Sequence, residues 1–191
     1  MAEEPPVVVG VTGASGAPIA VRVLEALHDA KVPVALVISE GARAVLREEM
    51  GIESTVLERF ATHSYADTDL AAPIASGSHP TRAMVVVPCS SNTVAKIALG
   101  LADTLITRAA HVHLKERRPL VVVPRETPFP TTLLRNLTVL SELGVVVLVA
   151  SPAYYLRPVT MDDATRYLAG KVLDHLSVPH ALYVGWKSDP R

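Results

Sequence analysis

The fold is decided by one stretch near the N-terminus, Val7-Val8-Val9-Gly10-Val11-Thr12-Gly13-Ala14-Ser15-Gly16. Its first five residues are apolar without alternation, which is typical of a strand buried on both faces of a parallel sheet. Two glycines and a hydroxyl group follow, and they suit a tight turn into a helix. The next segment, Pro18–Ala30, carries apolar residues at helical spacing. This succession of strand, glycine turn and helix predicts the start of a βαβ unit.

The same succession recurs along the chain. Further apolar runs lie at Val34–Ile38, Met84–Val87, Leu120–Val123 and Val145–Ala150. Further helices are expected at Gly41–Met50, Thr93–Leu99, Asp103–Glu116, Pro130–Leu143 and Asp162–Leu176. Strands that alternate with helices predict an α/β protein, a Rossmann-like doubly wound parallel sheet with helices on both faces.

The 191 residues fit a single domain. Residues 1–6 are expected to be an N-terminal extension and residues 183–191 a C-terminal tail. The segment Gly51–Thr81 breaks the rhythm of strands and helices, and its end is rich in small residues and proline. We expect a long, loop-like connection there, which in a compact domain is usually functional.

Composition narrows the possible functions. Eighteen Lys and Arg against nineteen Asp and Glu leave a net charge of -1, which argues against nucleic-acid binding by bulk positive charge. The single cysteine, Cys89, excludes an intramolecular disulfide and a cysteine-built zinc site. No apolar run reaches the ~18 residues of a membrane span, and the N-terminus is acidic. We therefore expect a cytoplasmic protein without nucleic acid, membrane or metal as a partner.

Polar residues follow every predicted strand, at the edge where open α/β sheets bind ligands. Ser15, after the first strand, is expected to cap the next helix, whose free N–H groups and positive dipole end would attract a phosphate. A second hydroxyl-lined helix start lies at Ser90–Thr93. Together they favour a phosphorylated ligand, although tight strand-to-helix turns alone would also explain them.

Arg125 and Glu126 are adjacent after the fourth predicted strand. Arg125 could bind anionic oxygens with its fork of donors, and Glu126 could transfer a proton or stabilise positive charge. An ion pair on a surface turn is the alternative. Upstream, Lys115–Arg118 closes a helix, where cations also suit the helix dipole.

Three other patterns favour ordinary structural roles. His111 and His113 point to different faces of a predicted helix and make a poor metal clamp. Cys89 has no evident histidine partner and is expected to be a small buried residue. Tyr167 and Lys171 match the catalytic pair of short-chain dehydrogenases, but the first turn lacks the further glycines of their nucleotide loop.

Several blocks of sequence share one pattern when they are taken together. They are Thr12-Gly-Ala-Ser-Gly-Ala-Pro18, Ala75-Ser-Gly-Ser78, Val85-Val-Val-Pro-Cys-Ser90, Leu114-Lys-Glu-Arg-Arg118, Val123-Pro-Arg-Glu-Thr-Pro128 and the tyrosines of Pro152–Pro158. In content and order they resemble the UbiX flavin prenyltransferases, within the flavin-binding, cysteine-decarboxylase-like proteins. The resemblance covers nearly the whole chain, and its Arg-Glu-Thr-Pro and Lys-Glu-Arg-Arg blocks are the most specific.

The resemblance implies transfer of a dimethylallyl group from dimethylallyl monophosphate to N5 and C6 of reduced FMN, without a metal. The product, prenylated FMN, would serve a UbiD-type decarboxylase, and the family commonly assembles as a dodecameric homo-oligomer. By the same resemblance, the flavin contacts fall on Gly13, Ala14, Ser15, Ser39, Ser90, Ser91, Asn92, Thr93 and Arg125. The isoprenoid phosphate falls to Arg108, Lys115, Tyr155 and Lys171. The catalytic roles fall to Ser15, Glu49, Lys115 and Glu126.

Departures from the family pattern leave alternatives open. Leu70 stands where many relatives carry Trp, and Lys171 where many carry Arg, which keeps the charge but loses bidentate geometry. Without the resemblance, Glu49 and Lys171 would be ordinary surface residues of helices. An FMN-dependent cysteine decarboxylase is disfavoured, because Pro152-Ala-Tyr-Tyr155 replaces the Pro-Ala-Met-Asn motif of that class. A flavin-binding subunit without chemistry is the other alternative, and the choice between a mono- and a diphosphate donor stays open.

Overall fold

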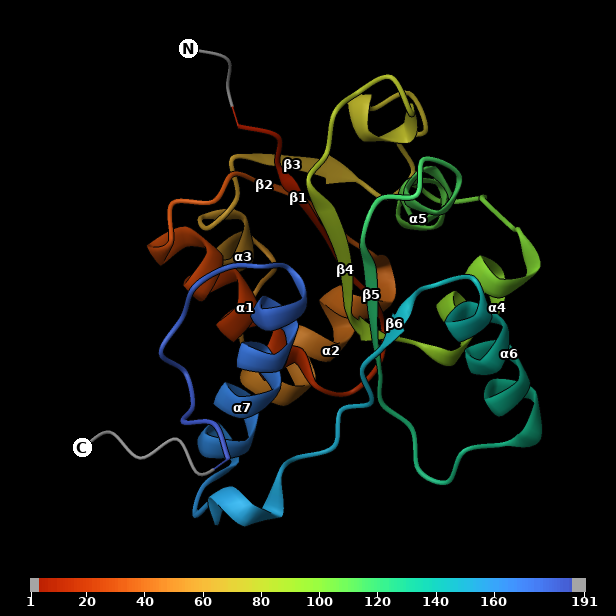
Figure 1. The fold of residues 1–191 in the computed structure, drawn as a ribbon. Coiled ribbons are helices and arrows are strands. Elements are labelled where there is room, and N and C mark those ends of the chain that lie inside the picture. Colours follow the sequence, from red (N-terminus) through yellow and green to blue (C-terminus); the bar gives the residue numbers. More distant parts are fainter. Residues whose placement is uncertain (1–3, 187–191) are drawn as a thin grey trace.

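Six parallel strands form the centre of the molecule (Figure 1). They are β1 (Val7–Val11), β2 (Val34–Ile38), β3 (His63–Ala66), β4 (Ala83–Cys89), β5 (Leu120–Pro124) and β6 (Val146–Val147). Their order across the sheet is β3-β2-β1-β4-β5-β6, and every neighbouring pair is parallel. The order reverses between β1 and β4, which is where ligands bind in doubly wound folds. The computed structural model describes residues 4–186.

Helices cover both faces of this sheet (Figure 1). The helices are α1 (Ala17–Asp29), α2 (Glu40–Met50), α3 (Thr55–Glu58), α4 (Ser91–Leu99), α5 (Leu105–Lys115), α6 (Thr131–Glu142) and α7 (Met161–His175), with short 3₁₀ turns η1 (Pro73–Ala75) and η2 (Tyr154–Leu156). One face packs against α1, α2, α3 and α7. The other packs against α4, α5 and α6. The Rossmann-like α/β architecture expected from the sequence is therefore confirmed.

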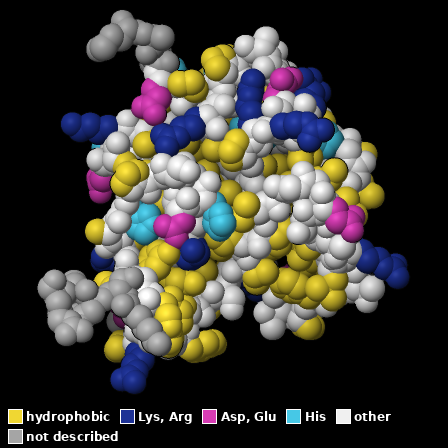
Figure 2. Space-filling model, viewed as in Figure 1, with side chains coloured by type: hydrophobic (Ala, Val, Ile, Leu, Met, Phe, Trp, Pro, Cys, Tyr) yellow, Lys and Arg dark blue, Asp and Glu magenta, His cyan; other side chains and the backbone are white. Residues whose placement is uncertain are grey.

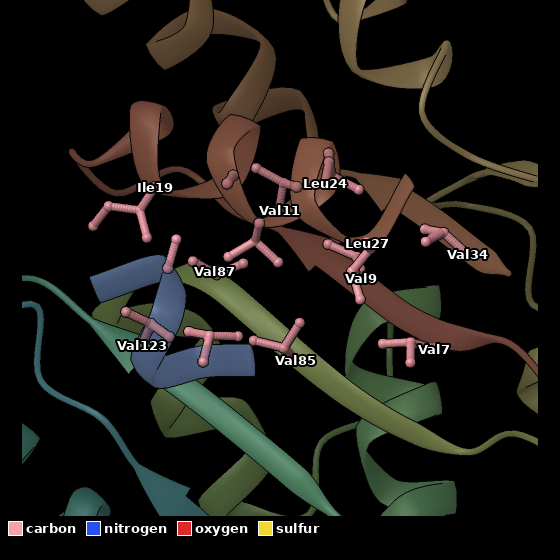
Figure 3. Packing of buried hydrophobic residues seen from close by; sticks show 14 of the residues in the cluster. Val7, Val9, Val11, Ile19, Leu24, Leu27, Val34, Val85, Val87 and Val123 are labelled. Carbon is pink, nitrogen blue, oxygen red and sulfur yellow. The ribbon is translucent and has the colours of Figure 1, made fainter. Parts of the chain in front are cut away.

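The unbroken valine runs follow from this two-sided burial. Val7, Val9 and Val11 lie in the core beneath α1 and α7 (Figure 3), whereas Val8 belongs to the core on the opposite face. Successive side chains of a strand point to opposite faces. Because both faces are covered by helices, no position in β1 needs to be polar, and all five residues are buried.

The segment Gly51–Thr81 is more regular than expected. It contains α3, the strand β3 and η1, so the expectation of a loop-like connection is wrong. β3 lies at the sheet edge and pairs only with β2. Its residues are exposed or half-buried. An edge strand that faces solvent carries no apolar run, which is why the sequence pattern did not reveal it. At the other edge β6 is shorter than expected, with only Val146 and Val147 paired to β5.

Both ends of the described part of the chain, residues 4–186, contact the domain. Pro6 accepts a backbone hydrogen bond of 2.9 Å from Arg82, and Glu4 forms an ion pair with the same arginine. At the C-terminal end, Tyr183 donates a hydrogen bond to Asp174 on α7. The first residue of the expected tail is thus anchored, and residues 187–191 lie outside the described residues.

Candidate active site

The turn after β1 lets two backbone segments approach each other closely. A Cβ on Gly13 would lie 3.0 Å from Cα of Gly41 at the start of α2, so only glycine lets these two backbones touch. Ala14 donates a backbone hydrogen bond of 2.8 Å to the carbonyl of Thr12, which tightens the turn. Gly16 is the N-cap of α1, with φ 118°, and its helix has no side-chain cap from that position. The expectation that Ser15 caps α1 is therefore wrong.

Glu49, on α2, supplies the missing acceptor at the start of α1. Its carboxylate accepts hydrogen bonds from the N–H of Gly16 at 3.0 Å and of Ala17 at 2.9 Å. Partial burial acts to raise the pKa of Glu49, but hydrogen bonds from Ser15, Gly16 and Ala17, with the nearby Arg125 guanidinium, outweigh it and hold the pKa below its ordinary value. In this structure the first N–H groups of α1 bind a carboxylate of the chain, not the phosphate that the sequence led us to expect.

Hydroxyl groups lie at the exits of β1, β2 and β4. Ser39 caps α2 by accepting a backbone hydrogen bond of 3.2 Å. Ser90 caps α4 by accepting one of 3.2 Å from Thr93. Thr12 links two of the exits, because its hydroxyl donates to the carbonyl of Pro88 at 2.9 Å and accepts from the N–H of Ser90 at 2.8 Å. The sequence-predicted flavin residues of these exits are thus brought to one edge of the sheet.

A cavity of about 350 Å³ opens between these exits. It is lined by Thr12, Gly13, Ser39, Gly41, Asp67, Ser90, Asn92, Thr93, Lys96, Thr104, Ile106 and Thr107. Most of the lining is hydroxyl, amide or charged, so the cavity suits a polar ligand with many hydrogen-bonding atoms. Five of the predicted flavin contacts line it, and they come from three different strand exits.

Four polar residues that line this cavity were not predicted from the sequence. Asp67 follows the unrecognised strand β3, and its carboxylate accepts a hydrogen bond of 2.9 Å from the N–H of Ile106 at the start of α5. Thr104 and Thr107 form the capping box of α5, a spacing that could have revealed them. Lys96 is paired with Asp103 at 2.7 Å, and nothing in its sequence context marks it.

Arg125 and Glu126 lie at the same edge, directly after β5. Both are half-buried. The Nε of Arg125 is buried without a hydrogen-bond partner among the described residues. Glu126 accepts a hydrogen bond of 3.4 Å from the hydroxyl of Ser91 and one of 3.1 Å from the N–H of Thr127. Among the ion pairs of residues 4–186, none joins Arg125 to Glu126, so the surface ion pair considered as an alternative does not form here.

Lys115 lies in a different part of the molecule from Arg125, and Arg108 is bonded to the chain itself. The Nε of Arg108 donates to the carbonyl of Ala75 at 2.9 Å. Lys115 is paired with Glu116, and a Cβ on Gly77 would collide with both side chains. Lys115 ends α5 and lies just before β5, at the amino edge of the sheet, whereas the Arg125 cluster lies after β5 at the carboxyl edge. One copy of the chain does not bring Lys115 to Arg125.

Lys171 is separated from Arg125 as well, and Tyr155 lies on another element. Tyr155 lies on η2, and its ring meets that of Trp186 edge-on at 4.9 Å. Lys171 is paired with Asp174 at 2.9 Å near the end of α7. That end lies at the amino edge, because Arg82, just before β4, donates to the carbonyl of Ser177 at 2.8 Å. Lys115 and Lys171 therefore lie toward the amino edge, whereas Tyr155 follows β6 on the carboxyl-edge side, where Arg125 lies.

Within residues 4–186, no group of three or more histidine, cysteine, aspartate or glutamate side chains is placed to hold a metal ion. In the same described part, no helix is both long and apolar enough to cross a membrane. His113 is buried and bonded on both ring nitrogens, to Thr81 and to the carbonyl of Ala109, as suits a structural histidine.

The fold and its glycine- and hydroxyl-lined carboxyl edge define a flavoprotein, and residues 1–172 match the family model described as Flavoprotein. The chain is 49% identical over 182 residues to flavin prenyltransferase UbiX of Thermoplasma acidophilum, covering 94% of this chain and 99% of that protein. It is 43% identical over 185 residues to flavin prenyltransferase UbiX of Deinococcus radiodurans, covering 97% and 95%. The chain belongs to the UbiX flavin prenyltransferase family, a family of transferases.

Solved structures agree with this placement. The crystal structure of AnUbiX (PadA1) in complex with FMN and dimethylallyl pyrophosphate matches with a TM-score of 0.94 at 36% identity, covering 97% of this chain and 99% of that one. A dodecameric FMN-dependent UbiX-like decarboxylase from Escherichia coli O157:H7 matches with a TM-score of 0.93 at 40% identity, covering 96% and 100%. The FMN-dependent cysteine decarboxylase TvaF, at 18% identity and a TM-score of 0.66, shares the fold alone.

The carboxyl-edge residues fit FMN. The close contact of Gly13 with Gly41 gives a backbone surface free of side chains. The cavity beside it offers the hydroxyl groups of Ser39 and Ser90 for a polar chain and a phosphate. The unpartnered Nε of Arg125 is a buried donor that needs an acceptor, which polar atoms of a flavin can supply. The hydrogen-bonding groups of these residues therefore fit those of FMN.

Proposed function

We propose that this protein transfers the dimethylallyl group of dimethylallyl monophosphate to N5 and C6 of reduced FMN. In this reaction the ester C–O bond breaks, and its electron pair leaves with the phosphate. N5 of the reduced flavin loses its proton as the carbon–nitrogen bond forms, and C6 loses its proton as the carbon–carbon bond forms. One of these two protons adds to the carbon–carbon double bond of the prenyl group, which ring closure consumes, and the other goes to the phosphate, so no oxidant is required. The observation that carries the proposal is the carboxyl-edge cluster, in which an arginine with a free buried donor lies close to two carboxylates.

Each residue of this cluster has its own role in our proposal. Arg125 binds the flavin through its free donor. Glu126, held by Ser91, is positioned to accept or return a proton. Glu49 fixes the turn that carries Ser15, and its lowered pKa keeps it ionised at neutral pH, so it stabilises positive charge that develops on the allyl group. Reduced FMN supplies the electron-rich ring when bound.

The ester half of the site requires a second copy of the chain in this proposal. Arg108, Lys115, Tyr155 and Lys171 are the cations and the phenol that suit a phosphate, yet Lys115 and Lys171 lie toward the opposite edge of the sheet from Arg125 within one chain. Lys115 is exposed at a helix end, where a neighbouring copy can receive it. The dodecamer formed by the E. coli relative supports a homo-oligomer in which neighbours complete each site.

The use of the product extends the same proposal. Prenylated FMN would leave the protein and serve a UbiD-type decarboxylase. A cytoplasmic location suits the reduced flavin acceptor, and the single buried thiol of Cys89 is consistent with a reducing compartment.

Mass spectrometry of the flavin tests the reaction. Purified protein is incubated anaerobically with reduced FMN and either dimethylallyl monophosphate or dimethylallyl pyrophosphate, without added metal. We expect a flavin heavier by one isoprenoid unit with the monophosphate. An unchanged flavin mass with both donors would overturn the proposal, and conversion with the pyrophosphate alone would correct the donor.

A variant separates the enzyme from a flavin-binding subunit without chemistry. Glu126→Gln should keep FMN binding while turnover falls by about two orders of magnitude, the usual contribution of one proton-transfer group. Glu142→Gln, at the exposed end of α6, is the matched control and should behave like the unmodified protein. Equal turnover of the two variants would remove Glu126 from the mechanism.

A further inference from the structure

One motif of the sequence has no place in the proposed reaction. Tyr167 and Lys171 are four residues apart on α7, so they lie on the same face, one turn from each other. Between them, Gly170 leaves that face without a side chain. The spacing resembles a dehydrogenase pair, but the structure shows a different use. The ring of Tyr183, from the segment after α7, lies on this face.

Gly170 makes room for the tyrosine. A Cβ at this position would lie 2.5 Å from Cδ1 of Tyr183 and 2.9 Å from Cε1 of His180. Glycine is less favourable than alanine within a helix, so a glycine inside α7 needs a packing reason. The ring of Tyr183 packs against Gly170, and this packing position, called here the seat of Tyr183, provides the reason. The ring of Tyr183 also meets that of Tyr167 edge-on at 5.1 Å.

Asp174 gathers the polar groups around this seat. Its Oδ2 accepts hydrogen bonds from the hydroxyl of Tyr183 at 2.5 Å and from Nζ of Lys171 at 2.9 Å. Its Oδ1 lies 3.0 Å from Nε2 of His180. The ammonium of Lys171 lies 6.0 Å from the centre of the Tyr183 ring. Figure 2 shows acidic, basic and histidine side chains grouped on the face where Figure 1 places α7.

The hydrogen bonds of this cluster keep Asp174 and Lys171 charged. Partial burial acts to raise the pKa of Asp174, but the hydrogen bonds from Tyr183, Lys171 and His180 outweigh it and lower the pKa to about 2. The hydrogen bond to Asp174 raises the pKa of Lys171. Lys171 therefore stays an ammonium group with one donor directed at Asp174. An ammonium has three donors, so at least one is left for a ligand beside Asp174 and Tyr183.

We infer that Asp174 and Tyr183 are positioning residues that hold the Lys171 ammonium for the phosphate of the isoprenoid ester. This inference rests on the proposed function, in which Lys171 binds that phosphate. A free lysine side chain loses rotamer entropy when it is fixed, and a side chain already held against Asp174 loses less on binding. The segment that carries Tyr183 thus tunes affinity for the ester without touching it.

The same segment also reaches the second phosphate candidate. Three residues after Tyr183, the ring of Trp186 meets that of Tyr155 edge-on at 4.9 Å. Tyr155 comes from η2 and Lys171 from α7, so two separate elements are contacted by one short stretch of chain. This placement is consistent with a segment that orders the ester-binding residues together.

The test measures ester binding and turnover separately in the full-length, FMN-loaded protein. Tyr183→Phe keeps the ring and removes the hydrogen bond to Asp174. We expect it to weaken binding of dimethylallyl monophosphate, measured by isothermal titration calorimetry, and to raise the KM, each by about fivefold, with kcat and FMN affinity unchanged. Asp174→Asn should weaken ester binding by about tenfold. Tyr65→Phe, which removes a tyrosine hydroxyl on β3, is the control and should change neither.

A double-mutant cycle shows whether Tyr183 acts through Lys171. In a Lys171→Ala background, Tyr183→Phe should add no further loss of ester binding, because the group that it positions is gone. An equal loss in both backgrounds would overturn the inference and indicate a general packing role. Unchanged ester affinity in Tyr183→Phe and Asp174→Asn would overturn it as well. If the unmodified protein binds the ester but converts no flavin, the proposed function fails and the positioning role is still tested by binding.

Discussion

The substitution Glu49→Gln removes one negative charge from the start of α1. In the structure, the Glu49 carboxylate accepts hydrogen bonds from Gly16 at 3.0 Å and from Ala17 at 2.9 Å. It does so across 33 residues of sequence, so it ties α2 to the turn after β1. Glutamine keeps one acceptor but loses the charge and places an N–H₂ group opposite an N–H donor.

The size of the effect follows from these contacts. A hydrogen bond to a charged group contributes roughly 1.5–3 kcal/mol when it is buried, and a charge at a helix end adds about 0.3–1 kcal/mol. Glu49 is exposed to solvent in the single chain, and screening reduces both contributions. We therefore expect Glu49→Gln to lower the free energy of unfolding by about 1 kcal/mol. For a chain of this length, that lowers Tm by about 2–4 °C.

Thermal unfolding as a function of pH is the assay. The pKa of Glu49 in the folded protein is lowered from its ordinary value of 4.5. A group with a lowered folded pKa stabilises the protein above its unfolded pKa and loses that contribution as pH falls through the folded value. The difference in Tm between the unmodified protein and Glu49→Gln should therefore be full above pH 4.5 and shrink below it.

Two results would refute this reasoning. An unchanged Tm at neutral pH would mean that the carboxylate does not stabilise α1. A difference in Tm that persists unchanged at low pH would mean that the charge of Glu49 is not responsible. Glu48→Gln, on the neighbouring exposed residue of α2, is the matched control and should leave Tm unchanged.

Three further predictions follow from the same structure. Arg125→Lys keeps the charge but loses the fork of donors, so FMN affinity measured by fluorescence quenching should fall by about tenfold; unchanged affinity would show that the free Nε does not meet the flavin. Gly170→Ala places a Cβ 2.5 Å from the Tyr183 ring, so ester affinity should fall as in Tyr183→Phe, even though alanine favours a helix by about 1 kcal/mol. A gain in Tm with full ester affinity would contradict the packing of Tyr183 on Gly170. Complete burial raises the pKa of the Cys89 thiol far above its ordinary range. Iodoacetamide should therefore label Cys89 only in unfolded protein, as followed by mass spectrometry, and rapid labelling of the native protein would contradict its burial.

The sequence by itself determined the central sheet and the polar edge. β1 and β2 have the bounds that the apolar runs predicted, because a strand covered on both faces cannot carry polar side chains. The helix start at Ser90 was also predicted, because a hydroxyl cap acts on its own first turn. Local rules of this kind need only neighbouring residues.

The tertiary structure alone decided the features that join distant residues. β3 carries no apolar run because it lies at an exposed sheet edge. The cap of α1 comes from Glu49 on another helix, and not from the adjacent Ser15. The seat of Tyr183 on Gly170 depends on how the chain returns after α7. Each of these depends on which surfaces meet in space, and hydrophobic periodicity and motif spacing carry no information about contacts between segments that are far apart in sequence.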